Sequence, residues 1–156
     1  RHRSGHPGMV PYQAFDTADQ PLLVCCGNDR LFAKLAQELG QGQWVDDARY
    51  ATNRARLVNK DALLAEMAAI LGGQTRAHWL ERFAQAGVPC APVHSVPEAL
   101  AHPQVQALEM LLPLRDAGFA LTALPLSFDG IRAGTDRSAP GLGAHNSEFG
   151  LQEDQP

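Results

Sequence analysis

An apolar run at residues 21–26, broken by Gly27, constrains the fold of this chain more than any other feature. The run has the length of a single strand, and continuous apolar character is typical of a strand buried on both faces. Residues 12–17 alternate before it, and Asp19-Gln20-Pro21 places turn residues between the two segments. This pattern predicts a β-hairpin whose second strand is buried.

The break after the run also predicts the start of a helix. Asn28 is a favourable N-cap residue, and the carboxylate of Asp29 suits the positive end of a helix dipole. Gly40 stands where a left-handed residue commonly ends a helix. The apolar residues between these limits keep helical spacing: Leu31, Phe32, Leu35 and Leu39.

Two further helices follow from the same signals. One is predicted to start at Asn59 and to end at Gly72-Gly73, and the other is capped by Thr75 and closed by Gly87. Residues 88–93 contain two prolines three positions apart, which predicts an extended connector and not a central strand.

The second half of the chain contains shorter elements. Ser95 and Glu98 have the spacing of a capping box, a short helical segment should start at His102-Pro103, and residues 110–124 read as a hairpin. Strand pairs separated by helices predict an α+β fold, with a small antiparallel sheet packed against several helices.

The organisation along the chain follows from glycine and proline content. We expect residues 1–11 to be a linker, residues 12–130 to form a small α+β domain, and residues 131–156 to run as an extended arm. The chain opens on Arg1-His2-Arg3 without an initiator methionine, so we expect a fragment of a larger enzyme that lacks a complete active site.

Composition argues against several classes of function. The net charge of −4 is unlike that of a nucleic-acid-binding protein, which carries a basic patch. No apolar run approaches the roughly 20 residues that span a bilayer. The odd number of cysteines (Cys25, Cys26 and Cys90) predicts free thiols in a reducing cytoplasm.

Two glycine-containing stretches are candidates for a ligand site. Gly5 and Gly8 flank His6-Pro7 and allow close approach to a ligand. His2 and His6 would share a metal only on a helix, which this stretch does not form, so no metal site is predicted. Residues 27–29 join a strand to a helix N-terminus, a habitual ligand position, although a plain helix cap is the simpler interpretation from the residues alone.

Two other motifs favour structural roles. Cys90 is the one thiol outside the apolar run, but no activating base is evident beyond His94, four residues on. The stretch Pro140-Gly141-Leu142-Gly143-Ala144-His145 is a weak dinucleotide signal because no strand–helix unit surrounds it, and it is read as a turn.

Taken in order, these stretches resemble the family III coenzyme A transferases, also called the CaiB–BaiF family. Residues 46–53 with Arg56 are similar to the family's "DPRFATNAAR" stretch, and residues 140–145 to its "PxLGEH" motif, with Ala144 in place of Glu. The other matching segments are His6-Pro7, residues 11–15 and 17–19, Gly27-Asn28-Asp29 with Phe32, Leu39-Gly40, and residues 86–93, 98–100 and 103–105.

The resemblance implies the small domain of an enzyme that moves coenzyme A between carboxylic acids through acyl-anhydride and thioester intermediates. It implies a catalytic aspartate in a large domain outside this chain, an interlocked homodimer, acyl-CoA and carboxylic acids as substrates, and no tightly bound cofactor. The isolated fragment is expected to be inactive. The residues expected to form one wall of the acyl pocket are Gly5, His6, Gly8, Tyr12, Gly27, Asn28 and Asp29.

Two alternatives stay open. The α-methylacyl-CoA racemases of the same family have a Gly-Ala-x-Glu pattern where this chain has Gly27-Asn28-Asp29, and the Asn-Asp form looks more like the transferases. The other alternative is a non-catalytic dimerisation domain.

Overall fold

The structure is a computed structural model, and it describes residues 4–151. Contacts between residues divide the chain into two compact units, Arg1–Val93 and His94–Pro156. Both contain short helices and small antiparallel sheets, which confirms the predicted α+β class.

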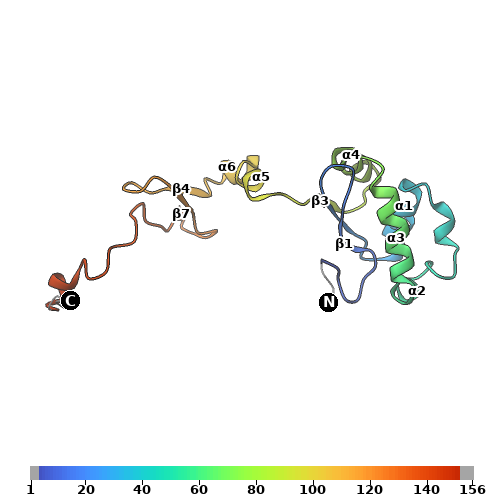
Figure 1. Ribbon diagram of the computed structural model, residues 1–156, viewed down its shortest axis with the longest axis horizontal. Helices are drawn as coiled ribbons and strands as arrows, with labels where there is room; N and C mark the ends of the chain where they lie inside the picture. The colour runs from blue at the N-terminus through green and yellow to red at the C-terminus, as the bar shows by residue number, and fades with distance from the viewer. Residues whose placement is uncertain (1–3, 152–156) are drawn as a thin grey trace. The chain divides into compact units, whose positions relative to one another are not determined.

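The first unit is a three-stranded antiparallel sheet with helices gathered around one side of it (Figure 1). The strand order is β1-β2-β3, so β2 is central. The elements are β1 (Tyr12–Phe15), β2 (Leu22–Cys25), α1 (Asp29–Glu38), the 3₁₀ turn η1 (Gly42–Val45), α2 (Asn53–Val58), α3 (Lys60–Leu71), α4 (Arg76–Ala86) and β3 (Cys90–Pro92).

The predicted hairpin is confirmed as β1 and β2. Tyr12 pairs with Cys25 at the open end of the hairpin, and Phe15 pairs with Leu22 beside the turn. Burial along β2 alternates between fully and partly buried residues, so the prediction of a strand buried on both faces is only half right. The helices pack against one face of the sheet, so the residues on its other face are buried only in part.

The core of the first unit is a single cluster of apolar side chains from the sheet and the helices. Phe32 stacks on Trp44, and Trp44 meets Tyr50 edge to face. The Trp79 indole donates a hydrogen bond to the Leu71 carbonyl at 2.9 Å, which satisfies its polar atom inside the core. Aromatic packing therefore joins α1, η1 and the loop before α2, and the indole hydrogen bond joins α4 to the end of α3.

The predicted caps at the ends of α1 and α4 are confirmed. The Asn28 side chain accepts from the Leu31 amide, and the Thr75 side chain accepts from the His78 amide. Gly40 and Gly87, after the last turns, have φ of 71° and 68°. Asn59 precedes α3 but does not cap it, because its side-chain amide instead donates to the Ala55 carbonyl.

Residues 88–93 differ from their prediction as a connector. Residues 90–92 form strand β3, which pairs with β2 along one edge of the sheet. The two prolines are tolerated because β3 lies at an edge, where one side needs no ladder partner. The Pro89 carbonyl accepts from the Cys25 amide at 2.9 Å.

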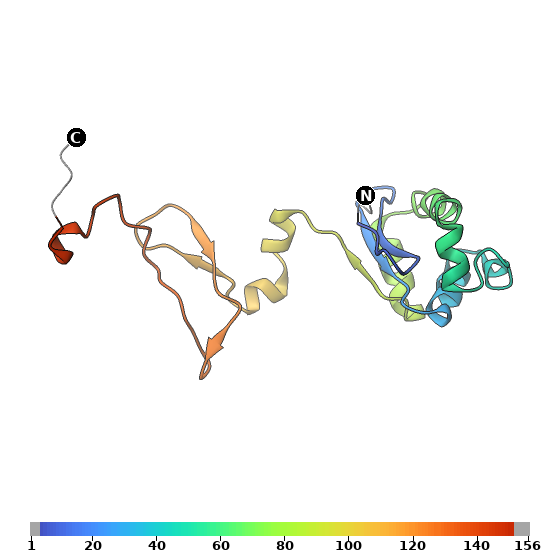
Figure 2. The ribbon, with the colours of Figure 1, turned by 90° about the horizontal axis from the view of Figure 1, so that it is seen from below.

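The second unit consists of short helices and two hairpins (Figure 2). Ser95 and Glu98 form the predicted capping box, and the predicted hairpin between residues 110 and 124 is present. The elements are α5 (Val96–Leu100), α6 (Pro103–Ala107), β4 (Leu111–Pro113), β5 (Ala120–Thr122), β6 (Ser127–Phe128), β7 (Ile131–Arg132) and the 3₁₀ turn η2 (Asn146–Phe149).

Candidate functional site

The loop before β1 and the end of β2 lie together at one edge of the sheet. They meet because the two strands are antiparallel, which places the start of one beside the end of the other. The Cys26 amide donates to the Pro11 carbonyl at 2.9 Å and extends this contact beyond the ladder. For this reason the loop before β1, which contains Gly5 and Gly8, is a neighbour of residues 27–29, although the two are far apart in the sequence.

Within the loop, His6 stacks on Tyr12. Their ring centroids are 5.3 Å apart, and the rings are within 15° of parallel. The His6 amide donates to the Tyr12 carbonyl at 2.9 Å, and the Gly8 amide donates to His6 Nδ1 at 3.0 Å. Gly5 is half-buried, whereas His6 and Gly8 are exposed. The loop is therefore an ordered turn with an exposed imidazole.

Residues 27–29 begin α1 with different roles. Gly27 is exposed, and a Cβ atom at this position would have open space around it. The Asn28 side chain is occupied as the helix cap. Asp29 Oδ1 accepts from the Asn53 amide at 2.9 Å and from Arg56 Nη2 at 2.7 Å. The carboxylate of Asp29 thus holds α2 against the start of α1.

Arg56 also belongs to this site, although neither its residue type nor its sequence neighbours predict a role there. Its side chain is fully buried, its Nε donates to the Val10 carbonyl at 2.7 Å, and its Nη1 donates to the Tyr50 carbonyl at 2.8 Å. Its guanidinium carbon lies 4.1 Å from the centroid of the Phe32 ring. In the sequence it stood out only within the stretch that resembles a family motif.

The thiols are poorly suited to nucleophilic chemistry. Burial raises the pKa of Cys26 to about 12. Burial also raises the pKa of Cys25, partly offset by a hydrogen bond with Tyr12, and it raises the pKa of Cys90. Because the thiolate is the reactive form, these shifts disfavour attack near neutral pH.

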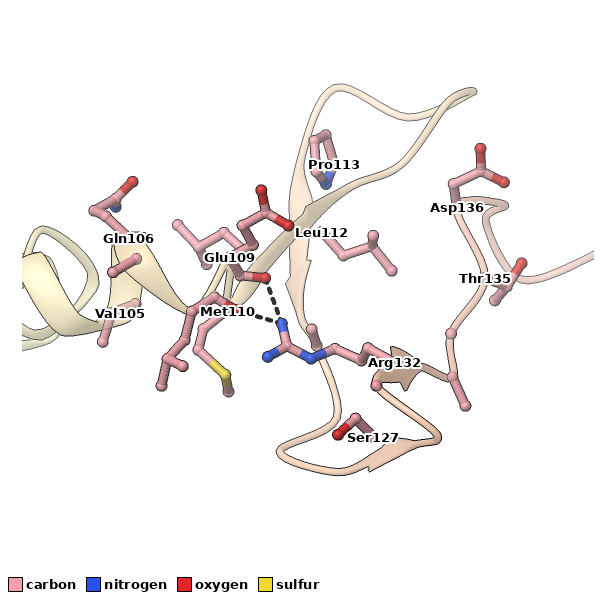
Figure 3. A pocket seen from close by; sticks show the side chains of 17 residues that line it. Val105, Gln106, Glu109, Met110, Leu112, Pro113, Ser127, Arg132, Thr135 and Asp136 are labelled. Atoms are coloured by element: carbon pink, nitrogen blue, oxygen red, sulfur yellow. Dashed lines mark hydrogen bonds between the residues drawn. The ribbon is translucent and has the colours of Figure 1, made fainter.

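A pocket of about 1000 Å³ lies in the second unit, apart from the predicted site residues. Figure 3 shows Arg132 reaching across it, and its Nη1 donates to the carbonyls of Leu108 and Glu109 at 2.6 and 2.8 Å. Thr135 and Asp136 line the pocket on the side away from Val105 and Gln106. The arginine is engaged in holding backbone segments of this unit together.

Residues 4–151 contain neither a cluster of metal-ligating side chains nor a helix that could span a membrane. Within this range no group of three or more His, Cys, Asp or Glu side chains is placed to hold a metal ion. The same residues include no helix with the length and apolar character needed to cross a membrane. His2, considered above as a metal ligand, lies outside the described residues.

Comparison with known proteins finds a family that matches nearly the whole chain. The model of the family described as CoA-transferase family III matches residues 1–146. Acetyl-CoA:oxalate CoA-transferase of Acetobacter aceti is 38% identical over 125 residues, which is 80% of this chain and 32% of that protein. Succinate–glutarate CoA-transferase of Agrobacterium fabrum is 32% identical over 152 residues, 93% of this chain and 37% of that protein.

Solved structures agree with the sequence matches. A CAIB/BAIF family protein from Brucella suis aligns with a TM-score of 0.78 at 32% identity, covering 94% of this chain and 38% of that one. This chain thus spans about a third of the length of the relatives that it matches. On these matches, the chain belongs to CoA-transferase family III.

Proposed function

We propose that the full-length protein moves coenzyme A between carboxylic acids, through a catalytic aspartate that lies outside this chain. The observation that carries the proposal is the family match over residues 1–146, together with relatives that are named CoA-transferases. Acyl-CoA thioesters and free carboxylic acids are the proposed substrates, and coenzyme A is a substrate and not a tightly bound cofactor. The proposed setting is a cytoplasmic, interlocked homodimer.

The contribution of this chain is one wall of the acyl pocket. The proposed wall residues are Gly5, His6, Gly8, Tyr12, Gly27, Asn28 and Asp29. Their proximity supports this role, because the hydrogen bonds through Asn53 and Arg56 hold the glycine-containing loop beside the start of α1.

A wall of this kind would protect the reaction intermediates from water. An aspartate carboxylate attacks the thioester carbonyl, and the released CoA thiolate then attacks the mixed anhydride to give an aspartyl thioester and a free acid. The incoming acid repeats these steps in reverse. Anhydride and thioester intermediates are both open to hydrolysis, so a rigid wall that excludes water favours transfer over loss of the activated acyl group.

The test is an assay of the full-length protein with a panel of acyl-CoA donors and acid acceptors. The new acyl-CoA and the exchange of α-protons with deuterated solvent are both measured. Formation of a new acyl-CoA supports the proposal. Proton exchange without transfer would refute it in favour of a racemase, and neither reaction with any pair would favour a non-catalytic dimerisation domain.

A second measurement concerns this chain alone. We expect no CoA transfer by purified residues 1–156, because the proposed aspartate is supplied by another part of the protein. Turnover by the purified fragment would place the catalytic group within these residues and contradict that part of the proposal.

A further inference from the structure

Helix α2 presents two side chains to the backbone of the loop before β1. The Asn53 side chain uses both ends of its amide: Nδ2 donates to the Gly8 carbonyl at 2.9 Å, and Oδ1 accepts from the Val10 amide at 3.0 Å. This reciprocal pair has the form of the contacts that a neighbouring strand would make. One side chain therefore replaces a strand partner for residues 8–10.

Arg56 holds the same loop from the buried side. Its Nε donates to the Val10 carbonyl, so both polar backbone atoms of Val10 are bonded to side chains of α2. The guanidinium has no solvent exposure and is balanced by Asp29, whose carboxylate also accepts from the Asn53 amide. A buried charge is costly to move away from its partners, so this arrangement strongly prefers one geometry.

The bonds that the Asn53 and Arg56 side chains make to the loop all end on its backbone atoms. They fix the path of the chain at residues 8–10 whatever side chains the loop carries, and they leave His6 exposed and stacked on Tyr12. A loop ordered before a ligand arrives does not lose conformational entropy at the moment of binding, which raises the apparent affinity.

We infer that Asn53 and Arg56 are positioning residues, which hold the loop at residues 5–12 in its binding conformation before an acyl-CoA arrives. The inference rests on the proposed function, and it adds two residues that act through the loop backbone and not on the reacting atoms.

The test uses the full-length protein with Asn53→Ala, which removes both side-chain bonds to the loop and leaves no buried charge unpaired. A loop that is ordered only part of the time reduces apparent affinity in proportion to the ordered fraction. We expect the KM for the acyl-CoA to rise about tenfold, with kcat at saturation within about threefold of the wild type. A partly unfolded sample would lower kcat and leave KM unchanged.

Trp79→Phe is the matched control. It removes the hydrogen bond between the indole and the Leu71 carbonyl, and so weakens the same unit through α3 and α4. Its KM should stay within about twofold of the wild type, since the loop bonds are intact. If Asn53→Ala does not fold, Asn53→Ser replaces it, because a serine side chain is too short to reach both Gly8 and Val10.

Amide hydrogen exchange gives a readout that is independent of activity. The Val10 amide should exchange at least about tenfold faster in Asn53→Ala than in the wild type or in Trp79→Phe. Unchanged exchange at Val10 would show that the Asn53 side chain does not hold the loop, and would overturn the inference. Faster exchange with an unchanged KM would overturn the positioning role while leaving the proposed function intact. A wild-type protein without transfer activity would refute the proposed function and the role in acyl-CoA binding. Exchange at Val10 would still show whether Asn53 holds the loop.

Discussion

At the scale of single residues, Arg56 is the one charged side chain that is fully buried among the described residues. It is charged, fully buried and bonded to three different segments, at Val10, Tyr50 and Asp29. An unpaired buried charge costs far more free energy than an unpaired surface charge, so the partners of Arg56 are constrained with it. Asp29 is one of those partners, and its role as a counterion comes before any role toward a ligand.

Replacing Asp29 tests this role directly. Asp29→Ala leaves the guanidinium without its counterion, and we expect a loss of about 1.5–3 kcal/mol in the free energy of unfolding of the first unit. The side chain of Asp29 is 55% exposed, so water can partly replace it and the cost stays below that of a fully buried pair. Asp29→Asn keeps an oxygen acceptor and should lose about 1 kcal/mol.

The measurement is urea denaturation of the 156-residue chain followed by tryptophan fluorescence. Both tryptophans, Trp44 and Trp79, lie in the core of the first unit, so the signal reports that unit. Equal losses for the two substitutions at Asp29 would contradict the counterion role.

At the scale of elements, the ends of the helices are where local sequence and structure agree best. Asn28 and Thr75 cap α1 and α4, and Ser95 with Glu98 caps α5, as their spacing predicted. Caps are predictable because their hydrogen bonds join residues only two or three positions apart, and no distant partner is needed.

The glycines that follow α1 and α4 give a matched pair of substitutions. Both have left-handed backbone angles, which cost an alanine about 1–2 kcal/mol. A Cβ atom at Gly40 would have open space, whereas one at Gly87 would lie 3.2 Å from Lys34 Nζ. That ammonium donates to the Ala86 carbonyl at 2.9 Å and would have to move.

We therefore expect Gly40→Ala to cost about 1 kcal/mol and Gly87→Ala to cost more, by up to about 1 kcal/mol for the disturbed hydrogen bond. The same urea titration compares the two. A larger loss at Gly40 than at Gly87 would show that the backbone angle and the Lys34 contact do not govern these positions.

At the scale of the whole molecule, the two units differ in how they bury apolar surface. The clustered core lies entirely within residues 1–93. Among the described residues of the second unit, Leu114 is the one buried apolar side chain. The large apolar side chains that this unit exposes are Val96, Leu108, Phe119, Leu121, Leu124, Leu126, Phe128, Ile131, Leu142, Phe149 and Leu151.

This difference predicts that residues 1–93 fold alone and residues 94–156 do not. A chain of about 90 residues with one contiguous core is large enough for independent stability, whereas a unit without a core cannot offset the entropy of ordering its backbone. Circular dichroism and proton NMR of the two separate peptides are the measurement. We expect a cooperative transition for 1–93 and narrow amide dispersion for 94–156. A cooperative transition in 94–156 would contradict the prediction.

Much of the local structure could be predicted from residues close together in the sequence. The hairpin of β1 and β2, helix α1 with its cap, and the hairpin of β4 and β5 all depend on turn residues and apolar spacing. The α+β class followed from their order. Strand β3 was harder, because its two prolines resemble a connector unless the neighbouring edge of β2 is known.

The sequence by itself therefore determined the hairpins of β1 with β2 and of β4 with β5, the capped helices, and the order of motifs that connects the chain with its family. The tertiary structure decided which distant residues meet. Only folding brings Asn53 and Arg56 to the loop at Gly8 and Val10, across more than 40 residues of chain, and makes Asp29 a counterion. Local propensity acts over a few residues, whereas the bonds that hold this candidate site depend on how the sheet and helices pack together.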